Sequence, residues 1–314
     1  MDLLLDEFKS SINPSKTRIK KTPTKFAVFG GKLDDVSNPD LYKSERNLFI
    51  TKVCDKHSDL RSALIIPESF KEWSDFGVYQ DLLSFEEDLG HLTRLVLLFL
   101  ESPGAFAELG AFIKIDSLRG QLQIVVQNQH VEKKDSFIYL GPLRHLLNEH
   151  PDSLHIFPYK TTEELEPHLD ALITHVREIL YIKEGSFRFK ESDQRSKFLL
   201  IADLVELFVV LKKPEIVSLL QHFNIKINKQ ELEQAIFLLE LFDLIRLGNY
   251  SNTSFLVSKF RKDQFLDFDS TDPKKPFVRE RFQISIFKKI NKNISTSHFL
   301  PSEIKEFLDK GNLC

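Results

Sequence analysis

The sequence predicts a mixed α/β protein in two parts: a parallel five-stranded sheet of the Rossmann or flavodoxin type, then a winged helix-turn-helix-like α+β domain. The first part is predicted because short apolar strands alternate with amphipathic helices, which is typical of βαβ units. The second part is predicted because the pattern after Gly185 changes to a series of helices that ends in a candidate hairpin. The 314 residues are enough for two domains.

Five short apolar runs are the expected strands of the sheet. They cover residues 25–29, 63–66, 94–100, 121–126 and 154–157. Helices are expected between and after them, near residues 43–56, 78–92, 103–113, 142–149 and 162–182. Sheets of this kind bind ligands beyond the carboxyl ends of their strands. Two of those ends stand out, Gly30-Gly31 and the turn at residues 101–104.

The order of elements after Gly185 is that of a winged helix. Helices are expected over residues 198–211, 214–223 and 228–244, and a hairpin over residues 245–257. Asn228 is the expected N-cap of the third helix. Another small α+β bundle is the alternative.

The third of these helices stands in the recognition position of a winged helix. It carries Glu231 and Glu233 near its tip, which is unfavourable in a DNA major groove. The domain would then bind a protein, or hold nucleic acid on its wing and its basic tail.

The net charge of −3 conceals a strong asymmetry along the chain. Residues 1–25 carry net +3, residues 26–185 net −10 and residues 186–314 net +4. Residues 1–25 are interpreted as a basic N-terminal arm, and residues 261–314 as a basic, aromatic-rich C-terminal extension. Basic stripes with interleaved aromatic side chains are typical of nucleic-acid binding. The expected nucleic-acid contacts are Lys16, Arg18, Lys20, Lys21, Lys259, Arg261, Lys262, Lys274, Lys275, Arg279 and Arg281.

Composition excludes several other classes of protein. No apolar run approaches the roughly 18 residues that span a bilayer. The first residues are acidic where a signal peptide is basic, so a cytoplasmic protein is expected. The two cysteines, Cys54 and Cys314, allow neither a disulfide framework nor a cysteine-based zinc site. The ten histidines show no metal-ligand spacing, so no metal site is expected.

The stretch 97–112 carries the strongest chemical signal. A buried strand leads into a turn where Ser102 can cap a helix and Pro103 can take its first position. The free amides of that helix start favour an anionic or oxygen-rich ligand. Glu108 lies a turn further in than capping requires, among small apolar residues, and burial there should raise its pKa or demand a partner. A solvent-facing glutamate is the alternative.

Three segments resemble a known family: LLSFEEDL at residues 82–89, ESPGAFAELGAF at residues 101–112 and SFIYLGPLRHL at residues 136–146. In this order they resemble the nucleoside 2-deoxyribosyltransferase-like effector proteins of bacterial retrons. The resemblance implies a glycosidase domain over residues 26–185, a winged-helix-like domain over residues 190–260, and Glu108 as the catalytic carboxylate.

The same resemblance implies a biological setting. It implies a toxin of antiviral defence, restrained by a retron reverse transcriptase and its multicopy single-stranded DNA–RNA product until phage infection. It also implies hydrolysis of NAD, which would be a substrate rather than a cofactor, and self-association into a homo-oligomer. No further cofactor is expected.

Cleavage of a ribosyl C1′–N bond passes through an oxocarbenium-like state, which one carboxylate stabilises while a second group handles the proton. Glu108 is the expected first group and Glu86 the expected second. A solvated acidic face formed by Glu86, Glu87 and Asp88 is the alternative. The other candidate substrate-binding residues are Gly30, Gly31, Glu101, Ser102, Gly104 and Arg144.

Two hypotheses of function follow. The turn at residues 101–104 lacks the Asp-Gly pattern of the deoxyribosyltransferases proper, which favours hydrolysis over base transfer. The first hypothesis is therefore an N-glycosidase that hydrolyses NAD or a related nucleotide. The second is a non-catalytic regulator that senses a nucleotide and binds nucleic acid.

Overall fold

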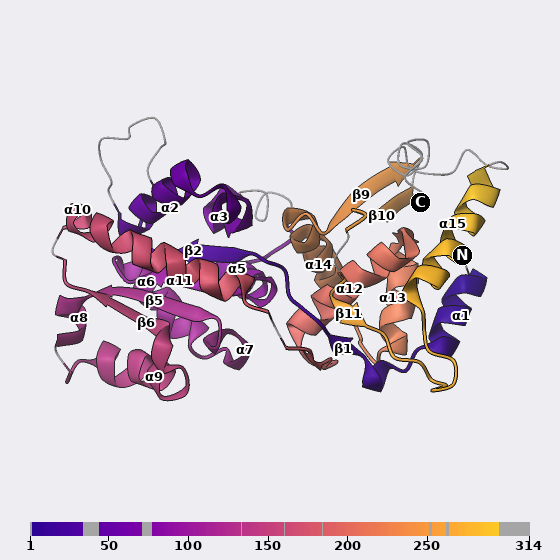
Figure 1. Cartoon of the computed structure of the whole chain (residues 1–314), viewed down its shortest axis with the longest axis horizontal. Coiled ribbons are helices and arrows are strands. Elements are labelled where there is room, and N and C mark those ends of the chain that lie inside the picture. The colour runs from indigo at the N-terminus through magenta and orange to yellow at the C-terminus, as the bar shows by residue number, and fades with distance from the viewer. Residues whose placement is uncertain are drawn as a thin grey trace. The chain divides into compact units, whose positions relative to one another are not determined.

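A computed structural model describes residues 2–33, 44–70, 77–132, 134–159, 161–183, 185–250, 253–261 and 264–294 (Figure 1). The chain divides into two compact units. Pro23–Lys183 forms the first unit, and Met1–Thr22 together with Glu184–Cys314 forms the second. None of the helices in the described ranges has the length and apolar character that crossing a bilayer requires.

A five-stranded, wholly parallel sheet forms the centre of the first unit, as the sequence predicts. Its spatial order is β3-β2-β4-β5-β6, so the second strand along the chain lies at one edge and the first beside it. This is the flavodoxin-like order, and the strand connections reverse direction between β2 and β4. The strands are β2 (Phe26–Phe29), β3 (Leu64–Ile65), β4 (Leu95–Phe99), β5 (Leu122–Gln127) and β6 (Leu154–Phe157).

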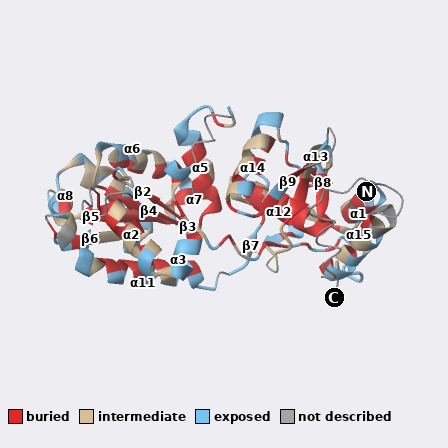
Figure 2. Cartoon of the chain, turned by 90° about the horizontal axis from the view of Figure 1, so that it is seen from above, coloured by how far each residue is buried: buried red, intermediate tan, exposed pale blue. Residues whose placement is uncertain are grey.

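Helices cover both faces of this sheet (Figure 2), so every residue of β2 and β4 is buried. Side chains alternate between the two faces along each strand. Phe26 packs against Phe49 of α2, with ring centroids 6.5 Å apart, while Phe29 packs against Phe112 of α6 at 5.1 Å. The helices of this unit are α2 (Glu45–Lys56), α3 (Ser58–Ala63), α5 (Leu82–Leu92), α6 (Pro103–Phe112), α7 (Asp116–Arg119), α8 (Asn128–Glu132), α9 (Arg144–Glu149), α10 (Thr162–Leu165) and α11 (Leu169–Tyr181).

Two expected helices of the first unit differ in detail. The helix expected over residues 162–182 is divided into α10 and α11 by a short 3-10 turn, Glu166–His168, that contains Pro167. Proline lacks the backbone donor that a continuous helix needs. The helix expected over residues 142–149 begins earlier, with a π-helical turn, Tyr139–Leu143, ahead of α9.

Residues 194–258 of the second unit form the helices α12, α13 and α14 and an antiparallel sheet in the order β8-β10-β9. These elements are α12 (Gln194–Phe208), β8 (Val210–Lys212), α13 (Lys213–His222), α14 (Lys229–Leu241), β9 (Ile245–Tyr250) and β10 (Thr253–Ser258). The expected helix over residues 198–211 is wrong at its end, because Val209 adopts φ +68° and the next two residues pair with β10. Asn228 caps α14 as predicted, accepting a hydrogen bond of 2.9 Å from the Glu231 amide.

The expected separate arm and extension are instead parts of this second unit. Strand β1 (Arg18–Ile19) lies between β7 (Phe187–Arg188) and β11 (Leu266–Asp267), and pairs with both. Helix α1 (Asp2–Ser11) places Phe8 within 6 Å, centroid to centroid, of the rings of Phe208, Phe268, Phe277 and Phe282. Helix α15 (Arg279–Ile294) supplies Phe282. Phe268, Phe277 and Phe282 of the extension therefore build a core with Phe8.

Candidate active site

Helix α6 begins at the carboxyl end of β4, next to the point between β2 and β4 where the strand connections reverse direction. Ser102 accepts a hydrogen bond of 3.2 Å from the Ala105 amide, and Pro103 occupies the first helical turn, as the sequence predicts. Ser102 is thereby engaged as the N-cap. Gly104 lies exposed at the helix start, where a β-carbon would meet only the Ser102 hydroxyl, at 3.8 Å.

Glu101 joins three backbone segments at this edge of the sheet. Its carboxylate accepts hydrogen bonds from the amides of Gly31 (2.8 Å), Arg46 (3.0 Å) and Glu45. Burial raises the pKa of Glu101, while the hydrogen bonds from the Arg46, Glu45 and Gly31 amides act in the opposite direction. Glu101 thus holds the start of α2 against the turn after β2.

The two glycines after β2 are explained by this close packing. Gly30 has φ +146°, a backbone conformation that other residues rarely adopt. A β-carbon on Gly31 would lie 2.7 Å from the carboxyl carbon of Glu101 and 2.8 Å from the β-carbon of Ser44. Both glycines therefore allow β2, β4 and α2 to pack closely. This packing accounts for the two glycines without a ligand at their backbone.

The carboxyl groups of Glu86 in α5 and Glu108 in α6 interact electrostatically. Burial raises the pKa of Glu86 to about 8, and the carboxylates of Glu108 and Glu68 add to the shift. Burial also raises the pKa of Glu108 to about 7, although the guanidinium of Arg46 opposes it. Both carboxyl groups are therefore poised to change charge near neutral pH, which is typical of catalytic acids and bases.

The remaining contacts of these glutamates separate them from ordinary surface acids. Glu86 is only 6% exposed, while its neighbour Glu87 is 44% exposed at its side chain. Asp88 accepts a hydrogen bond of 2.9 Å from the buried Tyr79 hydroxyl. The alternative of one solvated acidic face is therefore wrong. The Oε2 atom of Glu108 is buried and has no hydrogen-bond partner among the described residues, so it is free to face a ligand.

Sequence reasoning missed two members of the cluster, Arg46 and Glu68. The Arg46 side chain is 1% exposed, and its two terminal nitrogens donate hydrogen bonds of 2.5 and 2.6 Å to the Glu68 carboxylate. A buried arginine in the first turn of a helix opposes the helix dipole, and that misfit is the signal that could have identified it. Arg46 lowers the pKa of both Glu86 and Glu108, so it balances part of the negative charge of the cluster.

Arg144 does not reach this cluster. It lies on α9 beside an open groove of about 560 Å³. The groove is lined by Gly110, Ile113, Lys114, Phe137, Leu140, Gly141, Pro142, Arg144, His145 and Asn148. The side chains of Lys114 and Arg144 make no ion pair in the ranges that the structure describes.

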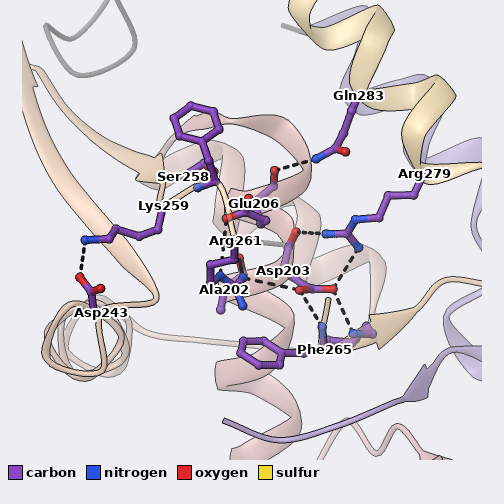
Figure 3. Close-up of polar contacts among 12 residues, drawn as sticks. Ala202, Asp203, Glu206, Asp243, Ser258, Lys259, Arg261, Phe265, Arg279 and Gln283 are labelled. Carbon is purple, nitrogen blue, oxygen red and sulfur yellow. Dashed lines mark hydrogen bonds and ion pairs between the residues drawn. The ribbon is translucent and has the colours of Figure 1, made fainter. Parts of the chain in front are cut away.

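Two predicted nucleic-acid contacts of the second unit pair with acidic residues inside that unit instead (Figure 3). Arg279 donates a 3.0 Å hydrogen bond to the Asp203 carboxylate and another of 3.1 Å to its carbonyl oxygen. Arg261 lies 3.6 Å from Asp203 and 3.5 Å from Glu206. The prediction that Arg261 and Arg279 bind nucleic acid is therefore wrong, because both guanidinium groups neutralise buried carboxylates within the unit.

The other predicted nucleic-acid contacts are nearer the surface. Arg18 donates hydrogen bonds to Ser186, Lys20 lies 3.6 Å from Asp267, and Lys259 pairs with Asp243. Lys21 is half-buried. Exposed positions are held by Lys16, Lys274, Lys275 and Arg281. Lys262 lies outside the described residues.

Comparison with known proteins identifies the class. The family model described as "STM3845 retron effector protein" matches residues 42–247, more than half of the chain. The chain therefore belongs to this family of retron effectors, and the match extends from the first unit into the second.

Two curated relatives from Escherichia coli are similar over shorter stretches. One, "Retron Ec73 putative ribosyltransferase/DNA-binding protein", is 29% identical over 161 residues, 51% of this chain and 49% of the relative. The other, "Retron Ec86 putative ribosyltransferase/DNA-binding protein", is 35% identical over 111 residues, 35% of this chain and 34% of the relative. The chain thus spans about half and about a third of the length of the curated relatives it matches.

Proposed function

We propose that the first unit of this retron effector is an N-glycosidase that hydrolyses NAD or a related nucleotide. The observation that carries the proposal is the pair of carboxyl groups, Glu86 and Glu108, whose pKa values partial or full burial raises to about 8 and about 7; Glu108 lies on the helix that follows the carboxyl end of β4. Ligands of such sheets bind at this edge, where the strand order reverses. The names of the two relatives, each "putative ribosyltransferase/DNA-binding protein", support chemistry at a ribosyl carbon.

The two carboxyl groups can divide the work of glycosidic cleavage. As the C1′–N bond breaks, positive charge develops on the ribose, and ionised Glu108, with its unpartnered Oε2 atom, stabilises that charge or bonds to the carbon. Glu86 has the higher pKa and holds its proton longer, so it hydrogen-bonds a ribose hydroxyl or donates to the departing base. Water then takes the place of the base at C1′.

The test is a comparison of wild-type protein with Glu108→Gln. Each is incubated with NAD, nicotinamide mononucleotide and deoxynucleosides, and released bases are separated by chromatography. Release of nicotinamide or a free base by wild-type protein alone supports the proposal and names the substrate. Release by both proteins removes Glu108 from the mechanism. Glu87→Gln is the matched control, because this exposed neighbour of Glu86 should be dispensable.

The proposal extends to regulation. A nucleotide-destroying enzyme is toxic to its own cell, so we propose a cytoplasmic effector of antiviral defence, held inactive by the retron reverse transcriptase and its multicopy single-stranded DNA until infection. We further propose that α12 to β10 form a winged helix, since two helices and a hairpin follow α12 in the expected order. On α14, Glu231 closes the N-terminal cap and Glu233 pairs with Lys213, which favours a protein partner over a DNA groove for this helix.

A second candidate function is a non-catalytic nucleotide sensor that binds nucleic acid. The exposed Lys16, Lys274, Lys275 and Arg281 favour it, and so does the DNA-binding part of the relatives' names. Salt-dependent affinity for single-stranded DNA, without release of any base from any nucleotide, would favour this function over the glycosidase.

A further inference from the structure

The face of α6 opposite Glu108 carries two hollows. Successive residues of an α-helix are 100° apart, so Phe106 and Gly110 point away from Glu108. Gly110 lines the groove of about 560 Å³ that also contains Lys114 and Arg144. Phe106 lines a second hollow of about 360 Å³ with His130 and Ser136. The segment 136–141 borders both hollows, so they follow one another along the same face of the helix.

The lining of these hollows is aromatic and cationic. Phe137 is 81% exposed and Leu140 is 48% exposed; Leu140 belongs to the π-helical turn ahead of α9, and Phe137 lies two residues before that turn. Lys114 and Arg144 offer two cations at the groove, and among the described residues no aspartate or glutamate lines either hollow. This is unusual in a region, residues 26–185, that carries net −10. An anionic ligand is therefore attracted here and repelled by much of the surrounding surface.

The dimensions suit a short strand. From Phe106 to Lys114 the helix and its final turn advance eight residues, or about 12 Å at the α-helical rise. A protein that binds a single strand combines aromatic rings, on which bases stack, with cations that follow the phosphates. Each hollow has an aromatic side chain, Phe106 in one and Phe137 in the other.

We propose that this outer face of α6 binds consecutive nucleotides of a single-stranded nucleic acid, with a base on Phe137 and phosphates on Lys114 and Arg144. The site is independent of the proposed glycosidase chemistry, because Glu108 faces the other side of the helix. It also assigns a role to Arg144, which the carboxylate cluster does not use.

The test measures binding of a fluorescent ten-nucleotide single-stranded DNA to the full chain by anisotropy. Phe137→Ala should weaken binding about ten-fold, the effect of losing one stacked base. The double variant Lys114→Glu and Arg144→Glu should weaken it further. Because each lost phosphate contact removes about 0.7 from the slope of log affinity against log salt, this double variant should lower that slope by about 1.4.

Matched variants make the result decisive. Lys56→Glu, an exposed charge reversal on α2, should bind as wild type. The binding assay does not measure release of a base, so a failed glycosidase proposal leaves this one standing. The inference is overturned if the groove variants bind the strand as tightly as wild type, or if only Lys16→Glu and Lys274→Glu in the second unit weaken binding. It is also overturned if AMP binds as tightly as the strand, or if Phe137→Ala converts an oligomer to a monomer in sedimentation, which would make this face an interface between copies.

Discussion

Replacing Glu86 by glutamine should make the free energy of unfolding of the first unit depend less on pH. The folded-state pKa of Glu86 is about 8, against an ordinary value of 4.5. The folded protein therefore binds this proton more tightly than the unfolded protein does. The contribution of Glu86 to the free energy of unfolding is fully present below pH 4.5 and is lost as the pH rises toward 8. Glu86→Gln keeps the shape of the side chain and removes its ionisation.

The magnitude follows from the two pKa values. Between about pH 5 and about pH 8, a group with these values lowers the free energy of unfolding by about 3 kcal/mol. Glu86 is only 6% exposed, so solvent screening reduces this figure little. The wild-type protein should lose that stability over this range, and Glu86→Gln should retain most of it.

The assay is urea unfolding of the full chain at both pH values, read by hydrogen exchange of peptides from residues 23–183 so that the second unit does not contribute. Glu87→Gln is the control, because its side chain is 44% exposed and it should follow the wild-type curve. If Glu86→Gln and wild type lose equal stability between the two pH values, Glu86 is not the buried carboxyl group described above.

Three further outcomes are expected. Glycosidase activity should rise as Glu108 ionises near pH 7 and fall as Glu86 loses its proton near pH 8, which gives a narrow bell-shaped pH–rate profile. Activity that stays constant from about pH 6 to about pH 9 would contradict these roles. Gly31→Ala should destabilise the first unit by about 1–3 kcal/mol in thermal unfolding, because its β-carbon would meet Glu101 at 2.7 Å, whereas Gly110→Ala, with nothing within 4 Å, should be neutral or stabilising. Asp203→Ala should destabilise the second unit by about 3–5 kcal/mol in calorimetry, because the substitution leaves the Arg279 guanidinium buried without its carboxylate partner. A loss below about 1 kcal/mol would show that solvent reaches this cluster.

Local patterns predicted the first unit well. The strand β6 has the expected bounds, and the cap at Ser102 and the start of α6 are as predicted. These features depend on neighbouring residues: an apolar run of strand length, then a capping side chain followed by proline. The parallel sheet follows from such units because each helix returns the chain to the same edge.

Features that depend on distant residues were not accessible to the same reasoning. Residues 18–19 gain their partners only at residues 187–188 and 266–267, so no local period revealed β1. The charge of Arg261 and Arg279 suggested a surface, but their partner Asp203 lies in a helix more than fifty residues earlier.

The same limits apply to the candidate site. The spacing of the S-P-G helix singled out Glu108, and Glu86 was found through its place on the preceding helix. Their catalytic roles stay predictions. Arg46 and Glu68 were missed because the one available signal, a basic residue in the first turn of a helix, does not show which partner that residue meets in space.

The pairing of β1 with β7 makes the first unit an insertion. Ile19 and Phe187 face each other across adjacent strands, so the chain leaves the second unit and re-enters it at neighbouring points. Domains whose ends are close can be excised or transplanted with little disturbance to the host. Joining residue 22 to residue 184 through a short glycine-serine linker should therefore yield a folded second unit without the carboxylate cluster, so that binding by this unit can be measured apart from the first.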